Sequence, residues 1–261
     1  MAIEIKPKIS WKCTTMGRVA TLNETLFSYL MQNDLSDTEL VIVNDYPYQT
    51  LIFDHPRVRV FNEPPFKTIG EKENFAVEQC KGEIIAVTDD DDVYMSTHNK
   101  NIKKFFTEDT NILHWQKGIY YNEPIIGAIA GIGNSGMVYS KKAWEAVGRH
   151  PIMNEGGDSD FSRKVQSLGN VVNAEPIDED ISAWYRWGMN GPDGNGVYHQ
   201  SGLGGESPDK PNILIRHGEH IERLRRKGLI PTGIIQLRPM WQYHYEKMLV
   251  DFIKNKNETK N

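Results

Sequence analysis

The first 88 residues alternate short apolar runs with amphipathic stretches, and this alternation limits the possible folds more than any other feature of the chain. Period-3.6 spacing of apolar residues is typical of helices, and short apolar runs bounded by polar residues are typical of buried strands. The pattern predicts strands within 3–15 and at 38–45, 57–61 and 83–88, and helices at 18–32 and 70–82. Strands that alternate with helices predict an α/β fold with a mostly parallel sheet between helices.

The pattern becomes irregular beyond about residue 110. Short apolar runs occupy 111–115 and 125–139, and helices are expected at 140–147, 158–168, 216–228 and 240–255. Residues 188–211 contain seven glycines and three prolines, which exclude a regular element and are typical of an unstructured loop or an active-site lid.

We expect two regions along the chain. The first is a domain over residues 1–215, which divides into a first half of about 1–95 and a second half of about 96–215. The second is a helical, basic extension over residues 216–261.

Composition excludes several classes of protein. The chain has 261 residues, 39% of them hydrophobic, and it shows neither a signal peptide nor an apolar run of the roughly 18 residues that a membrane helix needs. We therefore expect a cytoplasmic protein without a transmembrane segment. Cys13 and Cys80 are the only cysteines, so a disulfide scaffold or a cysteine-based zinc site is not expected, and we interpret both as packing residues.

Charge is unevenly distributed along the sequence. The formal net charge is −5, but residues 216–261 carry ten Lys and Arg against five Asp and Glu. This basic region is either the solvated surface of helices or a surface for a polyanion.

Four consecutive aspartates, Asp89 to Asp92, follow the apolar run 83–88. Parallel strands present their carboxyl ends at one edge of a sheet, so these side chains should lie beside Thr14, Thr15, Asn44 and Asp45. Two carboxylates about 4 Å apart repel by roughly 4 kcal/mol at an effective dielectric constant near 20, and a bound Mg²⁺ or Mn²⁺ would offset that repulsion.

Alternation along an extended chain would direct Asp89 and Asp91 to one side and Asp90 and Asp92 to the other, so one pair faces the cation. The competing interpretation is a solvated acidic turn that caps a helix starting near Ser96.

The sequence resembles the GT-A glycosyltransferases, in particular the inverting, family 2-like enzymes. The resemblance covers roughly residues 8–170. Its segments occur in the family's order: Thr14-Thr15 with Arg18, the helix end Ser28-Tyr29-Leu30-x-Gln32, VIVND with Asp45, Gly70 to Asn74, Lys81-Gly82-Glu83, TDDDD, GNSGMVYSKKAWEAVG (133–148) and GGDSDFSRKVQSLG (156–169). The resemblance implies a Rossmann-like, mostly parallel sheet flanked by helices. It also implies that residues 1–215 are a GT-A catalytic domain, with a nucleotide-sugar half of about 1–95 and an acceptor half of about 96–215.

Donor-binding roles follow from the resemblance residue by residue. It implies that Thr14 and Asp45 contact the nucleoside, that Asp89 lies near the ribose or the metal, and that Asp91 ligates Mn²⁺ or Mg²⁺ on the diphosphate of a UDP-sugar. Arg18 and Asp90 belong to the same donor site. The alternative frame, Asp90-x-Asp92, moves these roles by one residue.

Two later residues are further candidates for the donor site, and we assign them to the glycine-rich loop together with Trp184, Tyr185 and Trp187. Arg186 could pair with the diphosphate, and His199 could be a third metal ligand because imidazole accepts Mn²⁺. Trp184 and Trp187 flank this arginine and could either stack against a sugar or anchor the core.

Sugar transfer also needs a base that deprotonates the acceptor hydroxyl. The resemblance places Asp158 at the position of the family's catalytic aspartate, although Gly157 replaces the usual glutamate there. Asp160 and Glu155 are the alternatives for the base. The competing interpretation of Asp158 is a cap for the helix at 158–168.

The sequence leaves the acceptor and the exact reaction open. The acceptor could be a saccharide, a lipid-linked glycan, a protein, or a hydroxymethylated base in DNA. The DNA acceptor would use the basic cluster and its neighbouring aromatic residues: Arg223, Arg225, Arg226, Lys227, Arg238, Trp241, Tyr243 and Tyr245. Two other functional classes are compatible with the same α/β pattern. They are a sugar nucleotidyltransferase and a non-catalytic module that binds nucleotide sugars.

Overall fold

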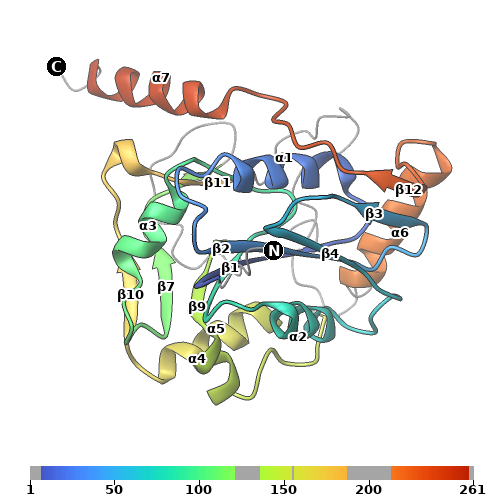
Figure 1. The fold of residues 1–261 in the computed structure, drawn as a ribbon, viewed down its shortest axis with the longest axis horizontal. Coiled ribbons are helices and arrows are strands. Elements are labelled where there is room, and N and C mark those ends of the chain that lie inside the picture. Colours follow the sequence, from blue (N-terminus) through green and yellow to red (C-terminus); the bar gives the residue numbers. More distant parts are fainter. Residues whose placement is uncertain (1–6, 121–135, 155, 187–212, 259–261) are drawn as a thin grey trace, which may run out of the picture.

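A seven-stranded sheet forms the centre of the protein in the computed structural model, which describes residues 7–120, 136–154, 156–186 and 213–258. The strand order is β10-β7-β9-β5-β1-β2-β4, and every neighbouring pair is parallel except the two that involve β9. The strands are β1 (Ile9–Thr15), β2 (Thr38–Asn44), β4 (Val58–Asn62), β5 (Ile84–Val87), β7 (Ile112–Trp115), β9 (Val138–Ser140) and β10 (Val171–Ala174). This arrangement confirms the predicted α/β fold with a mostly parallel sheet (Figure 1).

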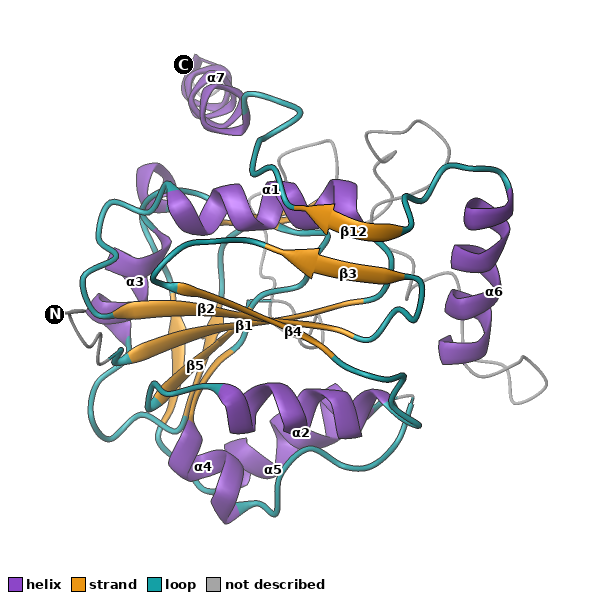
Figure 2. Cartoon of the chain, turned by 45° about the vertical axis from the view of Figure 1, so that its right-hand side comes forward, coloured by secondary structure: helices purple, strands orange, loops and turns teal. Residues whose placement is uncertain are grey.

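Helices cover both faces of the sheet (Figures 1 and 2). One face packs against α1 (Val19–Leu30) and α3 (His98–Phe105), and the other packs against α2 (Ile69–Gln79), α4 (Lys141–Ala146) and α5 (Gly157–Ser167). The start of α2 is fixed by a capping box, in which Thr68 and Glu71 each satisfy the other's backbone amide.

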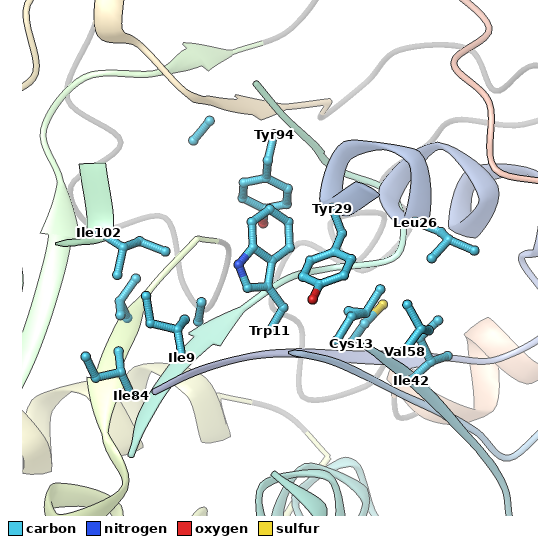
Figure 3. Close-up of a cluster of buried hydrophobic side chains, with 14 of the residues drawn as sticks. Ile9, Trp11, Cys13, Leu26, Tyr29, Ile42, Val58, Ile84, Tyr94 and Ile102 are labelled. Carbon is cyan, nitrogen blue, oxygen red and sulfur yellow. The ribbon is translucent and has the colours of Figure 1, made fainter. Parts of the chain in front are cut away.

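Alternation along β1 assigns its side chains to the two faces. Ile9, Trp11 and Cys13 enter the cluster under α1, where Trp11 meets Tyr29 and Tyr94 edge to face at 5.4 and 5.3 Å (Figure 3). The indole Nε1 of Trp11 donates to Asn99 at 2.8 Å, so the buried ring has no unmet donor. The residues between them therefore face α2, and they include Lys12.

The structure contains two small sheets that the sequence pattern did not predict. One joins β6 (Val93–Tyr94), β11 (Ala183–Tyr185) and β8 (Ile119–Tyr120), and the other pairs β12 (Gly233–Gln236) with β3 (Gln49–Ile52). Assigning Trp184 and Tyr185 to a glycine-rich loop was wrong, because both side chains are buried in strand β11. Trp184 anchors the core against Tyr245, with ring centroids 5.1 Å apart.

The C-terminal region packs closely on the first half of the chain. Strand β12 extends β3, and α6 (Ile213–Arg226) buries Ile221 and Leu224 against Tyr46. Helix α7 (Tyr245–Glu258) starts five residues later than expected. The division into regions 1–215 and 216–261 stays a prediction. Within the described residues no helix has both the length and the apolar character needed to cross a membrane.

Candidate active site

The carboxyl ends of β5, β1 and β2 lie side by side at one edge of the sheet. The strand order reverses here, since β2 and β4 follow β1 on one side while β5 lies on the other, and ligands of α/β sheets bind at such a reversal. The strands deliver Thr14 and Thr15, then Asn44 and Asp45, then the aspartates that follow Val87. The predicted gathering of these polar residues at one edge is confirmed.

The four aspartates form a turn, which we call the acidic turn (Asp89–Asp92). The amide of Asp92 donates to the carbonyl of Asp89 at 3.4 Å, and the Thr25 hydroxyl lies 3.2 and 2.9 Å from the carbonyl oxygens of Asp89 and Asp92. The strict alternation expected for an extended chain is therefore wrong. Asp90 is directed toward Thr15, whose hydroxyl donates to it at 2.5 Å, while its three neighbours group together.

Asp89, Asp91 and Asp92 form a candidate cation site. Each offers a carboxylate oxygen, and these oxygens all lie within 4.8 Å of one another. Burial, together with the charges of Asp92 and Asp91, raises the pKa of Asp89 well above its ordinary value. Carboxylate oxygens are the ligands that hard divalent cations prefer, so the three residues fit Mg²⁺ or Mn²⁺.

Arg18, just before α1, supplies positive charge to the acidic turn. Its guanidinium binds both carboxylate oxygens of Asp90, one of them through Nε at 3.1 Å, and donates to Asp91 at 2.5 Å. Burial opposes the charged guanidinium, but Asp90, Asp91 and Asp89 outweigh it and raise the pKa of Arg18. Both carboxylate oxygens of Asp90 bind Arg18, and only one oxygen of Asp91 does. The candidate ligands are therefore Asp89, Asp91 and Asp92, whose oxygens group together.

Lys72 of α2 links the ends of β1 and β2. Its Nζ donates to the Thr15 carbonyl at 2.7 Å and to Asp45 Oδ1 at 2.5 Å, and the other Asp45 oxygen accepts from the Phe66 amide at 3.4 Å. Asp45 is therefore held in one orientation at the edge of the sheet. Lys72 could not be recognised from the sequence, because nothing in the local sequence pairs it with an aspartate 27 residues earlier.

A second buried ion pair lies beneath the edge. Lys12 pairs with Glu73, and the other carboxylate oxygen of Glu73 accepts from the Thr14 hydroxyl at 2.9 Å. Thr14 is thereby oriented from below, as Asp45 is by the neighbouring Lys72. The local sequence does not identify Glu73 as the partner either, although a lysine inside the strand pattern of β1 signals that a partner must exist.

Arg186 follows β11 and is fully buried. Its Nε donates to the Asp91 carbonyl at 2.5 Å, its backbone amide donates to Asp92 Oδ1 at 3.0 Å, and its guanidinium binds Glu24 of α1. The structure thus places Arg186 behind the acidic turn, where it binds protein groups.

Asp158 lies in the first turn of α5 and is half-buried. Its Oδ1 accepts from the Ser159 amide at 2.8 Å, and the residue at the cap position of this helix is Gly156. The alternative base Asp160 forms an ion pair with Lys164 at 2.8 Å on the solvated side of the helix. Asp158 has no such cationic neighbour among the ion pairs of the described residues.

The loop before α5 is attached to the start of α2. The Ile69 amide donates to Asn154 Oδ1 at 2.9 Å, and the Gly70 amide donates to the Met153 carbonyl at 3.1 Å. These contacts place Met153 and Asn154, shortly before α5, beside the start of α2, the helix whose Lys72 reaches Asp45.

Three further candidates, His199, Glu155 and Trp187, lie outside the described residues. In the basic cluster of the C-terminal region, Arg225 and Arg226 both bind Glu222, at 2.5 and 3.2 Å. These ion pairs offset part of the positive charge that suggested a polyanion.

Comparisons with known proteins agree with the α/β fold. Residues 13–129 match the family model described as glycosyl transferase family 2. No curated protein sequence matches the chain significantly.

Three solved structures illustrate the shared fold. S. aureus TarS 1–349 is 16% identical, with a TM-score of 0.55 over 69% of this chain and 60% of TarS 1–349, so this chain spans less than two thirds of it. TarS 1–349 in complex with UDP-GlcNAc is 13% identical to this chain. Its TM-score is 0.56 over 94% of this chain and 71% of the TarS chain. The mannosyltransferase PcManGT from Pyrobaculum calidifontis, in complex with GDP-Man and Mn²⁺, is 13% identical, with a TM-score of 0.55 over 87% of this chain and 73% of the other.

Proposed function

We propose that this glycosyltransferase, which has the GT-A fold and carries a glycosyl transferase family 2 region over residues 13–129, is a metal-dependent, inverting enzyme that uses a UDP-sugar. The observation that carries the proposal is the candidate cation site of Asp89, Asp91 and Asp92 at the reversal of strand order. The complexes of the two similar proteins with a nucleotide sugar, and in one case with Mn²⁺, support it.

Donor binding would use the edge formed by β1, β2 and the acidic turn. In the proposal Thr14 and Asp45 contact the nucleoside, each held by a partner on α2. Asp89, Asp91 and Asp92 hold a Mn²⁺ or Mg²⁺ ion, whose chemistry when bound is to stabilise the negative charge of the departing diphosphate. Arg18 lies beside these carboxylates and limits their repulsion.

Transfer itself requires one proton movement by the protein. The carboxylate of Asp158 takes the proton of the acceptor hydroxyl while the acceptor oxygen bonds to the anomeric carbon and the bond from that carbon to the diphosphate oxygen breaks. A single displacement of this kind inverts the anomeric centre. We propose a hydroxyl acceptor without assigning it to a saccharide, a lipid-linked glycan, a protein or modified DNA.

Thermal stabilisation by UDP-, GDP- and dTDP-sugars, with and without Mn²⁺, tests the donor and metal assignments. We expect a UDP-sugar to raise the melting temperature of the wild type more with Mn²⁺ than without it. In Asp91→Asn the additional rise in melting temperature caused by Mn²⁺ should be lost. In Asp90→Asn that rise should be kept, because Asp90 faces Thr15 and Arg18. The reverse result for the two variants would assign the cation to the Asp90-x-Asp92 frame, and no response to any nucleotide sugar would refute the proposal.

Asp158→Asn tests the base assignment. We expect the variant to bind donor normally and to lose transfer by roughly 10²- to 10⁴-fold, because a positioned general base contributes about that much. Asp160→Asn is the matched control on the same helix and should retain transfer, since Asp160 is engaged with Lys164. Full transfer by Asp158→Asn in an assay that follows release of the nucleoside diphosphate would remove Asp158 from the mechanism.

A further inference from the structure

We infer that Arg186 and Tyr245 are positioning residues, which couple the C-terminal segment to the acidic turn and set the geometry of its carboxylates for a divalent cation. This inference rests on the proposed function in one respect, the role of Asp89, Asp91 and Asp92 as cation ligands. The coupling itself is a property of the protein without the cation.

Arg186 fixes the acidic turn at two points. The Nε of its guanidinium donates to the Asp91 carbonyl at 2.5 Å, and its backbone amide donates to Asp92 Oδ1 at 3.0 Å. The first contact holds the backbone of the turn, and the second selects the orientation of the Asp92 carboxylate. Asp92 belongs to the candidate cation site, so the position of Arg186 decides where one of its three ligands lies.

Glu24 of α1 determines where the guanidinium of Arg186 lies. The two side chains form an ion pair, and both are fully buried. A buried charge needs a partner and further hydrogen bonds, and the Glu24 carboxylate gains these from the C-terminal segment. The Gln242 amide donates to Glu24 Oε1 at 2.7 Å, and the Tyr245 hydroxyl lies 3.3 Å from the same oxygen.

Tyr245 completes the arrangement, because its hydroxyl also accepts from Arg186 Nη1 at 3.0 Å. The hydroxyl therefore contacts both members of the buried pair, while its ring packs against Trp184. A chain of direct contacts runs from the first turn of α7, through the pair of Arg186 and Glu24, to the backbone of Asp91 and the carboxylate of Asp92.

Trp241 provides a parallel connection. Its Nε1 donates to the Ser28 hydroxyl at 3.0 Å, and the Ser28 oxygen accepts from the Tyr94 amide at 3.2 Å, two residues beyond the acidic turn. Glu24, Thr25 and Ser28 thus lie on one face of α1, where Thr25 contacts the turn directly. The C-terminal segment and the acidic turn are held against the same helix face.

Variants that keep the side-chain volume test the coupling. Tyr245→Phe removes only the hydroxyl, and Arg186→Lys keeps the charge but loses the Nε contact with the Asp91 carbonyl. Groups that orient metal ligands typically change metal affinity by about 10- to 100-fold when altered. We expect the dissociation constant for Mn²⁺ to rise within that range for Arg186→Lys, and by about tenfold for Tyr245→Phe, which acts through Arg186.

The measurements are Mn²⁺ titration, followed by the electron paramagnetic resonance signal of free Mn²⁺, and amide hydrogen exchange of residues 89–92 without metal. Both are made well below the melting temperature of each variant. In metal-free protein we expect faster exchange at the Asp92 amide in Tyr245→Phe than in wild type. Tyr243→Phe is the matched control, because Tyr243 lies in the same segment but is 44% exposed, and it should match wild type in both measurements.

Two results separate this inference from the proposed function. Wild-type Mn²⁺ affinity and wild-type exchange in Tyr245→Phe would overturn the inference, even if Asp91→Asn abolishes Mn²⁺ binding. Absence of Mn²⁺ binding by the wild type, or undiminished binding by Asp91→Asn, would instead refute the cation site and the part of the inference that depends on it. A merely structural role would lower the melting temperature of Tyr245→Phe without changing either measurement, and that outcome also overturns the inference.

Discussion

Lys12 and Glu73 show how a buried ion pair can support residues at the edge of a sheet. Burial alone would raise the pKa of Glu73, but the Lys12 ammonium, His150 and the hydrogen bonds from Lys12 and Thr14 outweigh burial and lower it to about 2. The folded protein therefore holds this carboxylate ionised under conditions in which the unfolded chain would protonate it.

Acid should weaken the fold through Glu73. Its ordinary pKa is 4.5, so its contribution to stability is complete above that pH and is lost as the pH falls toward 2. A difference of this size corresponds to about 3 kcal/mol in the free energy of unfolding. We expect urea unfolding at pH 5, 4, 3 and 2 to show a steeper loss for the wild type than for the double variant Lys12→Met/Glu73→Gln.

The double variant is the suitable comparison, because Glu73→Gln alone would leave the Lys12 charge buried without its counter-ion. Carboxylates elsewhere titrate equally in both proteins, so only the difference between the two pH profiles reports on Glu73. Parallel profiles would show that the pair contributes no pH-dependent stability.

At the residue scale, the sequence predicted the positions of Thr14, Asp45 and the four aspartates because each follows an apolar run directly. It did not predict their partners. Lys72 and Glu73 are 27 and 61 residues from the groups they bind, and such distant pairings exist only once α2 lies on the sheet. The division of the aspartates into Asp90 and its three neighbours likewise depends on a turn, which the extended-chain argument did not include.

Gly70 determines how the first turn of α2 meets the loop before α5. A Cβ atom at this position would lie 1.9 Å from the Pro151 carbonyl oxygen, closer than any two such atoms approach. The loop, which is hydrogen-bonded to Ile69 and Gly70, therefore depends on a residue without a side chain. The loop leads into α5, which carries Asp158 in its first turn.

Gly70→Ala should displace that loop. Overpacking of this kind typically costs about 1 to 3 kcal/mol of stability, and a displacement near 1 Å at a reacting group can lower its rate by as much as about 100-fold. We expect kcat to fall roughly tenfold or more while donor KM changes less, as measured by steady-state kinetics at 25 °C. Gly157→Ala is the control, because its added methyl group meets the flexible Met153 side chain at 3.2 Å, and it should change kcat much less.

At the scale of elements, the predictions were confirmed where the spacing of apolar residues within a segment was enough to indicate a helix or a strand. The strands β1, β2, β4 and β5 and the helices α1, α2 and α5 have enough apolar residues to define their type locally. Strands β6 and β11 span two and three residues, too few for any period, and they form because Trp184 is buried when the chain returns to β6. Strand β12 was missed for a similar reason, since three of its four residues are exposed and only pairing with β3 defines it.

Across the whole molecule, the C-terminal helix shares a core with segments from the middle of the chain. Leu249 and Ile253 of α7 pack in a cluster with Val93, Ile119 and Trp184. The helical spacing of apolar residues predicted a helical extension, but the sequence could not show what the apolar face of that helix contacts. Because the shared cluster joins distant segments, we expect the described regions to unfold together.

Leu249→Ala tests this cooperation. A leucine truncated at a nearly buried site costs about 2 to 5 kcal/mol, so the midpoint of denaturant unfolding should fall markedly for the whole protein. Far-ultraviolet circular dichroism and tryptophan fluorescence should report one shared transition. The neighbouring Val250→Ala, at a side chain 48% exposed, should change the free energy of unfolding by no more than about 0.5 kcal/mol.

Separate transitions by the two probes would show that α7 unfolds on its own, and that its contacts contribute little to the sheet.

The contacts of Glu24 also fix an order of events during synthesis of the chain. Glu24 emerges early, its partner Arg186 follows 162 residues later, and Tyr245 follows 221 residues after Glu24. A nascent chain therefore already contains every aspartate of the acidic turn long before it contains the groups that hold them from behind. The turn acquires its full set of contacts only when translation has reached Tyr245 at the start of α7, so a growing chain cannot assemble the complete site before that residue has been made.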